Sequence, residues 1–201
     1  MSIHKACKPV LVAYATREGQ TRKIAEHVAA TLRARNFEVD VVDVGSDEPV
    51  ELPFYCAAIL LASLHLRKHE REMTAFAKTN HDVLARMPTA FLSVSLAEAG
   101  AEDSSRSPAL RAEAATGVRE AIDAFVAETK LHPAHVHPVA GALLYKEYGA
   151  IVRLVMRAIS KRAGGPTDTS RDYELTDWLA LDRFVDEIAE GLPRGEGSRT
   201  A

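Results

Sequence analysis

Residues Val10–Thr21 read VLVAYATREGQT, an apolar run that ends in small, hydroxylic, charged and glycine residues. The run Val10–Tyr14 is nearly continuous in apolar side chains, as in a parallel strand that is covered on both faces. Beyond Thr21, apolar residues recur at helical spacing, namely Ile24, Ala25, Val28, Ala29 and Leu32. The stretch therefore predicts a buried strand, a turn over Thr16–Thr21 and a helix.

The predicted turn has the properties of a binding site for a phosphate monoester. It offers the hydroxyls of Thr16 and Thr21, unpaired backbone N–H groups and the positive end of a helix. Gly19 permits a positive φ or a close backbone approach. One glycine cannot make G-x-G-x-x-G, and no Gly-Lys-Ser/Thr follows, so a dinucleotide loop and a P-loop lose their main support. The alternative is an ordinary solvated helix start capped by Thr16.

Composition limits the class of protein. With 201 residues, 47% of them hydrophobic, the chain is long enough for one well-buried domain and short for two. The net charge of −3 argues against a nucleic-acid partner. Two cysteines and the lack of an opening signal segment predict a cytoplasmic protein. No apolar run reaches the roughly eighteen residues of a spanning helix, so membrane contact would be peripheral.

Strands and helices alternate along the chain, which predicts an α/β fold. Hydrophobic patterning predicts further strands at 37–44, 56–62, 89–95 and within 135–144, and helices at 22–35, 70–87, 110–129 and 177–190. Segment 96–108 is small and polar and predicts a loop. We expect a doubly wound sheet of five parallel strands in the order 2-1-3-4-5, with helices on both faces. Pro138 then lies in an edge strand, and the loops after strands one and three flank one crevice.

The last third of the chain is longer than this fold needs. We expect one domain over residues 8–191, with an inserted segment at about 145–176 before the last helix, and flexible tails at 1–7 and 192–201. Within the insert, 148–162 has a broad apolar face, and its charges in 151–162 are all basic. Such a helix suits an anionic lipid surface or the cover of an apolar site, but also simple packing on the sheet.

With this segment included, the chain resembles the flavodoxin-like menaquinone-dependent protoporphyrinogen oxidases, also called protoporphyrinogen IX dehydrogenases, over about residues 10–188. The resemblance rests on TREGQT at 16–21, Ala62-Ser63, MPTAF at 87–91, AGAL at 140–143 and, most distinctively, GGPTDT at 164–169 followed by Tyr173 and TDW at 176–178. It implies a flavodoxin-like sheet, FMN, peripheral membrane association, and the oxidation of protoporphyrinogen IX to protoporphyrin IX in haem biosynthesis with a quinone as acceptor.

The resemblance also implies site residues. The FMN phosphate would be wrapped by Thr16, Arg17, Glu18, Gly19, Gln20 and Thr21, with the Glu18 carboxylate turned to solvent because a phosphate would repel it. The isoalloxazine would lie against Ser63, Leu64, His65, Leu66, Ser93, Val94, Ser95, Leu96, Gly141, Ala142 and Leu143. For such a substrate, Arg67, Lys68 and Arg153 could hold the propionates. The alternative for Arg67 and Lys68 is that they are ordinary solvated cations at the start of a helix.

Two features depart from the family pattern or limit what it implies. Relatives carry aromatic residues at the positions of Leu66 and His69, and a missing stacking partner forfeits on the order of 1 kcal/mol of flavin contact. No catalytic acid or base is identified, because the flavin carries the electron chemistry.

The histidines complete no metal-ligand pattern, so we expect no metal site. A flavodoxin-type electron carrier or a flavin-binding module without porphyrinogen activity remains the alternative. The oligomeric state is not determined by the sequence.

Overall fold

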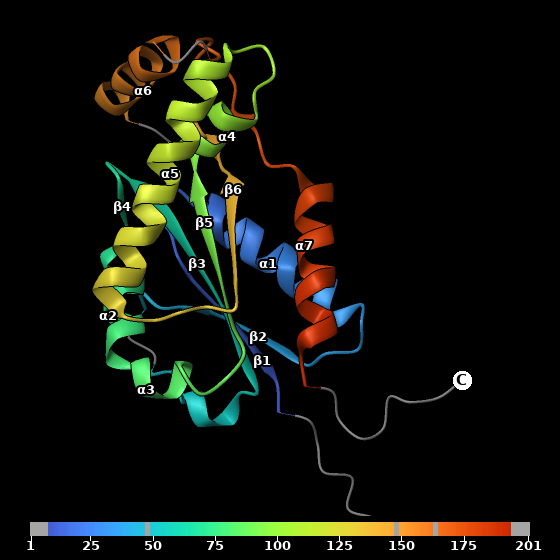
Figure 1. The fold of residues 1–201 in the computed structure, drawn as a ribbon. Helices are drawn as coiled ribbons and strands as arrows, with labels where there is room; N and C mark the ends of the chain where they lie inside the picture. Colours follow the sequence, from blue (N-terminus) through green and yellow to red (C-terminus); the bar gives the residue numbers. More distant parts are fainter. Residues whose placement is uncertain (1–7, 47–48, 147–148, 163–164, 194–201) are drawn as a thin grey trace, which may run out of the picture.

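The structure is a computed structural model and describes residues 8–46, 49–146, 149–162 and 165–193. Five long parallel strands form its centre in the order β2-β1-β3-β5-β6 (Figure 1). Their bounds are Val10–Ala15 for β1, Val39–Asp43 for β2, Ala57–His65 for β3, Thr89–Ser95 for β5 and His135–Ala140 for β6. Counted over these strands, the predicted order 2-1-3-4-5 is confirmed. Pro138 lies in β6, which is an edge strand as predicted.

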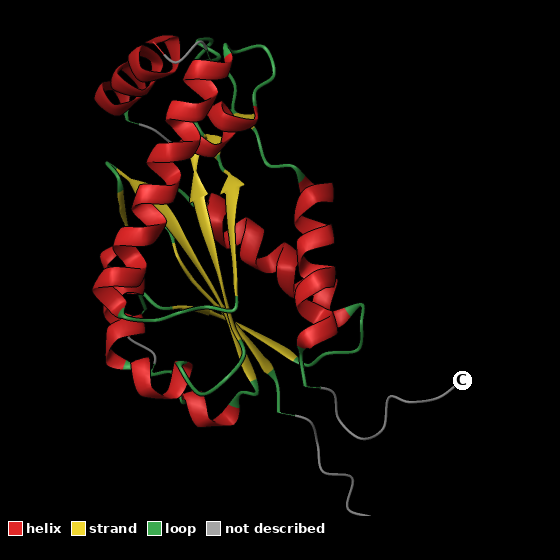
Figure 2. Ribbon diagram, viewed as in Figure 1, coloured by secondary structure: helices red, strands yellow, loops and turns green. Residues whose placement is uncertain are grey.

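Helices cover both faces of the sheet, as Figure 2 shows. One face carries α1 (Gln20–Arg33) and α7 (Trp178–Gly191), and the other carries α2 (Arg71–Thr79), α3 (His81–Leu84) and α5 (Pro108–Thr129). Strand β1 shows how the sequence builds two cores, because successive side chains point to opposite faces. Val10, Val12 and Tyr14 join the core under α1 and α7, and Leu11, Ala13 and Ala15 join the other.

The prediction of a loop over 96–108 is wrong for its first half, because residues Leu96–Glu102 form the helix α4. The backbone N–H of Glu98 donates to the Oγ of Ser95, which is a helix-capping bond. Alanine, leucine and glutamate are good helix formers, so the small residues that suggested a loop favour a helix once it is capped. Ser107 caps α5 in the same way, and Pro108 is its first residue.

Several element boundaries also differ from the predictions. The predicted helix over 70–87 is divided into α2 and α3 at Asn80. The third strand, predicted to end at residue 62, continues to His65 as β3, and the chain then turns back into the two-residue strand β4 (Lys68–His69). Much of the loop predicted after this strand is therefore strand. A short 3-10 helix, η1 (Leu52–Phe54), precedes β3. The strand β4 and the helix η1 are too short to show the periodicity by which longer elements are predicted.

The insert contains both a helix and a small second sheet. Strand β7 (Ala142–Leu143) pairs antiparallel with β8 (Tyr173–Glu174), and α6 (Ala150–Arg162) lies between them in sequence. A minor core unites Leu143 and Tyr145 with Leu96, Leu144, Met156 and Tyr173. Tyr145 is fully buried and donates its hydroxyl proton to the carbonyl oxygen of Pro166, as does the Ser160 hydroxyl. The insert is therefore a packed layer at one end of the sheet rather than an extended loop.

Some sequence predictions fall where the structure gives no description. Residues 1–7 and 194–201 of the predicted tails lie outside the described residues, as does Tyr148, the first residue of the predicted inserted helix. Leu192, which the predicted domain boundary leaves out, is buried in the core under α1 and α7.

Candidate functional site

The carboxyl ends of β1, β3, β5 and β6 meet at one edge of the sheet because these strands are parallel. In Figure 1 this edge faces up, toward α4 and α6. The residues predicted to contact the cofactor are the last residues of these strands or follow them directly. The topology therefore brings together four segments that are distant in sequence.

The β1–α1 loop retains the features of an anion site in the folded chain. Gly19 has φ +90°, and nothing lies within 4 Å of the position that a Cβ would take. Its N–H donates to Thr16 Oγ1 over 3.1 Å. No side chain among the described residues caps α1. The Thr21 hydroxyl is buried and has no hydrogen-bond partner among the described residues. An uncapped helix start beside an orphaned buried hydroxyl suits a bound anion.

Arg17 and Glu18 extend from this loop toward the end of β3. The Arg17 Nε lies 2.9 Å from Glu70 Oε1, and Arg17 stays mostly exposed. Glu18 Oε2 lies 3.2 Å from His65 Nε2, and Glu70 Oε1 lies 3.4 Å from the same nitrogen. This nitrogen is buried and makes no well-aligned hydrogen bond, so the two contacts are electrostatic rather than directional. Glu18 thus faces an imidazole, where solvent was predicted.

Gln20 is buried, and its side chain is hydrogen-bonded to the insert. The amide Nε2 donates to Glu174 Oε1 over 3.1 Å and to Thr176 Oγ1 over 3.0 Å. Thr176 in turn donates to the carbonyl of Ala140, and Lys23 lies 2.6 Å from Glu174. Burial opposes ionisation of Glu174, but the hydrogen bonds from Lys23 and Gln20 lower the pKa of its carboxyl. The start of α1 is therefore bonded directly to β8 of the insert.

The hairpin after β3 presents the remaining residues of that segment. Ser63 is buried, and Leu64 and His65 are half-buried. Leu66 and Arg67 form the turn with left-handed φ values of 49° and 64°, and Leu66 is 97% exposed. Arg67 forms an ion pair with Glu120 of α5, and Lys68 is exposed on β4. Of the three predicted substrate cations, Arg67 thus has a carboxylate partner already.

The residues at the end of β5 are buried. Ser93 is fully buried, and its Oγ lies 2.8 Å from His69 Nε2. His69 packs edge-on against Phe91 and Phe125, and burial lowers its pKa to about 4. Val94 belongs to the core under α1 and α7.

The helix that follows β5 carries an acidic face near the site. Ser95 caps α4, and Leu96 packs in the minor core of the insert. Burial raises the pKa of the Glu98 carboxyl, with Glu102 adding to the effect.

The segment after β6 approaches β5 closely. The Gly141 N–H donates to the Ser95 carbonyl over 2.9 Å, and a Cβ on Gly141 would touch Val94 Cγ1 at 3.5 Å. Ala142 and Leu143 form β7 and pair with β8. Arg153, the third predicted substrate residue, donates from Nε to the Tyr145 carbonyl within the insert. Its side chain is thus bonded to the segment between β7 and α6.

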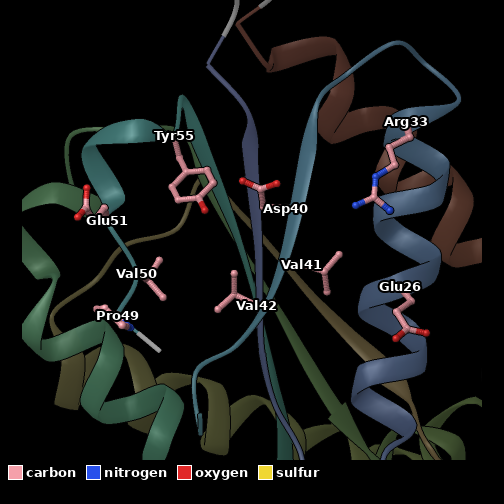
Figure 3. A pocket seen from close by; sticks show the side chains of 9 residues that line it. All are labelled: Glu26, Arg33, Asp40, Val41, Val42, Pro49, Val50, Glu51 and Tyr55. Carbon is pink, nitrogen blue, oxygen red and sulfur yellow. The ribbon is translucent and has the colours of Figure 1, made fainter. Parts of the chain in front are cut away.

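A separate hollow of about 570 Å³ lies against the outer edge of β2. Figure 3 shows Glu26 and Arg33 of α1 on one side of the strand and Glu51 and Tyr55 on the other. Asp40 adds a third carboxylate, and Arg33 is already bonded to the Val39 carbonyl. This charge pattern does not suit an anionic cofactor, so the carboxyl edge of the sheet remains the candidate site.

Sequence reasoning gave no role to Glu70 or Glu174, and it named Thr176 only as part of the family motif TDW. It considered His69 as a metal ligand, which it rejected, and as a position where relatives carry an aromatic residue. All four act through partners far away in sequence. Among the described residues, no group of three histidine, cysteine or acidic side chains is placed to hold a metal ion. In the same part of the chain, no helix is long and apolar enough to cross a membrane.

Comparisons with known proteins give the following similarities. Residues 11–170 match the flavodoxin domain family. The protoporphyrinogen IX dehydrogenase [quinone] of Escherichia coli strain K12 is 31% identical over 179 residues, which are 89% of this chain and 93% of that protein. The protein of the same name from Leishmania major is 29% identical and matches 89% of this chain and 74% of its own. Among solved structures, flavodoxin 1 from Bacillus cereus has a TM-score of 0.53 at 17% identity, covering 92% of this chain and 99% of its own.

Proposed function

We infer the function of this chain from its family, because it belongs to the flavodoxin domain family and, with its bacterial and protozoan relatives, to the protoporphyrinogen IX dehydrogenases. We propose that it oxidises protoporphyrinogen IX to protoporphyrin IX in haem biosynthesis, using FMN and a quinone acceptor. The observation that carries this proposal is the similarity to the E. coli enzyme over 89% of the chain.

The β1–α1 loop fits the phosphate of FMN. The orphaned Thr21 hydroxyl, the uncapped start of α1 and the open left-handed Gly19 each provide what a phosphate monoester requires. We assign Thr16, Arg17, Gly19 and Thr21 to the phosphate, with the Gln20 side chain used for the insert. When bound, FMN supplies the electron acceptor for each two-electron oxidation of the substrate and passes the electrons to the quinone.

The flavin ring and the substrate would then occupy the carboxyl edge between the β3 hairpin, the start of α4 and β7. Leu66 offers an apolar side chain there, and Lys68 offers an exposed cation for a propionate. The residues buried in β5, Ser93 and Val94, would support this wall from behind. Arg67 would have to exchange its contact with Glu120 for a propionate, so it contributes less than Lys68.

The proposal is tested on purified protein loaded with FMN. The flavin should be released as FMN on denaturation, and protoporphyrinogen should yield fluorescent protoporphyrin faster with a quinone than without an added acceptor. If the FMN-loaded protein gives no porphyrin above the non-enzymatic rate, yet still cycles its flavin with an artificial reductant, the electron-carrier function replaces this one.

We further propose peripheral contact with an anionic membrane through α6. Its charged residues are all basic, with Arg157 and Lys161 exposed, and Leu154 is 66% exposed beside them. Each basic residue near an anionic surface contributes roughly 1 kcal/mol. The protein should therefore float with anionic vesicles at low salt, and the double variant Arg157→Glu, Lys161→Glu should not. Identical flotation of both proteins would exclude this contact.

A further inference from the structure

Glu70 is a buried carboxylate at the junction of three segments of the site. It is 4% exposed and precedes α2, yet its side chain does not cap that helix. Instead, its Oε2 accepts from Arg17 Nε over 3.1 Å, and its Oε1 lies 2.9 Å from the same nitrogen. Oε1 also accepts from Ser63 Oγ over 3.2 Å. The same residue is anchored by its backbone, because its N–H donates to the Ser63 carbonyl. Glu70 therefore joins the β1–α1 loop to the end of β3.

The contact engages only one edge of the Arg17 guanidinium. Among the described residues, the bonds of Arg17 run from Nε to Glu70, and its side chain is 62% exposed. Because the guanidinium is planar and rigid, a bond at Nε fixes the direction of the two Nη groups. A paired Nη edge is the fork that binds phosphate bidentately. Burial of a carboxylate costs free energy, so this contact is not explained by stability alone.

We propose that Glu70 is a positioning residue that orients Arg17 toward the phosphate monoester of the cofactor. This inference rests on the proposed function, in which FMN binds at the β1–α1 loop. Glu70 itself does not touch the phosphate, since Arg17, Ser63 and His65 surround its oxygens and a carboxylate would repel a phosphate. Its effect passes through Arg17.

The charge of Glu70 gives the proposal a distinctive sign. If Glu70 acted only as a nearby negative charge, its removal would strengthen the binding of a phosphate dianion. If it orients Arg17, its removal releases the guanidinium and weakens the binding of phosphate. The two roles thus predict opposite changes in FMN affinity.

The experiment compares FMN with riboflavin, which lacks the phosphate, in apo-protein titrations. Glu70→Gln should weaken FMN binding by about tenfold and leave riboflavin binding within about twofold of wild type. Arg17→Lys keeps the charge but lacks the fork, so it should reproduce that loss. The double variant should be no weaker than either single variant. Glu72→Gln is the matched control, because it removes a carboxylate near Arg17 that is bonded instead to Arg71; its FMN affinity should stay equal or rise.

Three outcomes would overturn the inference. The first is Glu70→Gln binding FMN as tightly as wild type or tighter, and the second is an equal loss for riboflavin. The third is a double variant whose loss is the product of the single losses, because two independent contacts would then act. Should Glu70→Gln fail to fold, Glu70→Asp keeps the charge but shortens the side chain, and it should show the same selective loss of FMN binding; unchanged FMN binding in that variant would overturn the inference. A wild-type protein that binds FMN no better than riboflavin would overturn the proposed function of the loop as well.

Discussion

At the scale of single residues, the Thr21 hydroxyl is the most direct test of the phosphate site. It is buried and unpaired, so it costs stability in the protein without cofactor. Thr21→Val, which keeps the shape, should leave the melting temperature unchanged or raise it, and should weaken FMN binding by about 1 kcal/mol. Calorimetry with and without FMN measures both effects.

A matched threonine gives the control for that change. Thr31 lies on the same helix, but its hydroxyl donates to Asp182 over 3.1 Å. Thr31→Val should lower the melting temperature and leave FMN binding unchanged. Should both variants behave alike, Thr21 has no role in binding the cofactor.

His69 makes stability depend on pH. Burial lowers its pKa from 6.5 to about 4, so the folded protein binds fewer protons than the unfolded chain between these values. The stability that this histidine contributes is complete above about pH 6.5 and decreases by about 3 kcal/mol as the pH falls to about 4. Urea unfolding at pH 7 and pH 4.5 measures the decrease.

Two histidine variants separate this effect from other titrations. His69→Gln should flatten the stability profile between pH 7 and pH 4.5. His132→Gln, at an exposed position, should leave the profile as it is in the wild type. Equal slopes for wild type and His69→Gln would contradict the assignment.

The β1–α1 loop could be predicted from the sequence because its features are local: a strand end, hydroxyls, one glycine and a helix start. Glu70 could not, because nothing adjacent to it in sequence reveals Arg17 as its partner. The same holds for Thr176, which meets Gln20 only after the insert folds back. Residues whose role depends on a tertiary contact leave no periodic signal.

At the scale of elements, the β3–β4 hairpin carries backbone strain at its tip. Leu66 has a left-handed φ of 49° and is 97% exposed, so it gains little packing in return. Leu66→Asn should stabilise the protein by about 1 kcal/mol, since asparagine tolerates this conformation and suits such turns. Chemical denaturation measures the gain.

The control for the turn is another exposed leucine in regular helix. Leu154→Asn in α6 should cost about 0.5 kcal/mol, because asparagine is the poorer helix former. If the two variants shift stability in the same direction, strain in the turn is not the cause.

The hairpin tip also lacks an aromatic residue. The substitution Leu66→Tyr would measure what an aromatic side chain at this position adds to the binding of the flavin.

The contact between α1 and the insert predicts a coupled response. Gln20→Ala removes two hydrogen bonds from a buried amide, which should cost about 1–3 kcal/mol. Hydrogen exchange should rise at residues 173–176, while the amides of β1 and β3 keep their protection. Uniform exchange across the sheet would mean that the insert and the sheet unfold together. Lys78→Ala, which removes an exposed contact with Glu128, should change neither region.

The helix α4 shows why one element was predicted incorrectly. Its small polar residues resemble a loop in composition, and its cap, Ser95, is also the last residue of a strand. Ser95 therefore serves both as the end of a strand and as the cap of a helix. In the sequence, its role in the strand hides its role as a cap. The two-residue strands β7 and β8 are too short for any pattern, and their pairing joins segments separated by α6.

At the scale of the whole molecule, the sheet order was predictable because the three central strands, β1, β3 and β5, are apolar and each is followed by a helical pattern. Parallel strands joined by helices allow few arrangements, since the crossovers are right-handed and short. Pro138 then fixed which strand lies at the edge. The insert adds nothing to this order, so its structure could not be inferred from the rest of the sheet.

The proline in β6 also bears on how copies of the molecule behave toward one another in a crowded cell. Parallel sheets that end in open strands can recruit strands from neighbouring chains, which begins aggregation. Here one border lacks a backbone donor at Pro138, and the other, β2, carries the Asp40 carboxylate beside a charged hollow. Both edge strands therefore disfavour the addition of another strand. The edge at β6 lacks the backbone N–H of Pro138, and the edge at β2 carries a carboxylate that repels other acidic chains. The fold thus resists polymerisation through its own sheet.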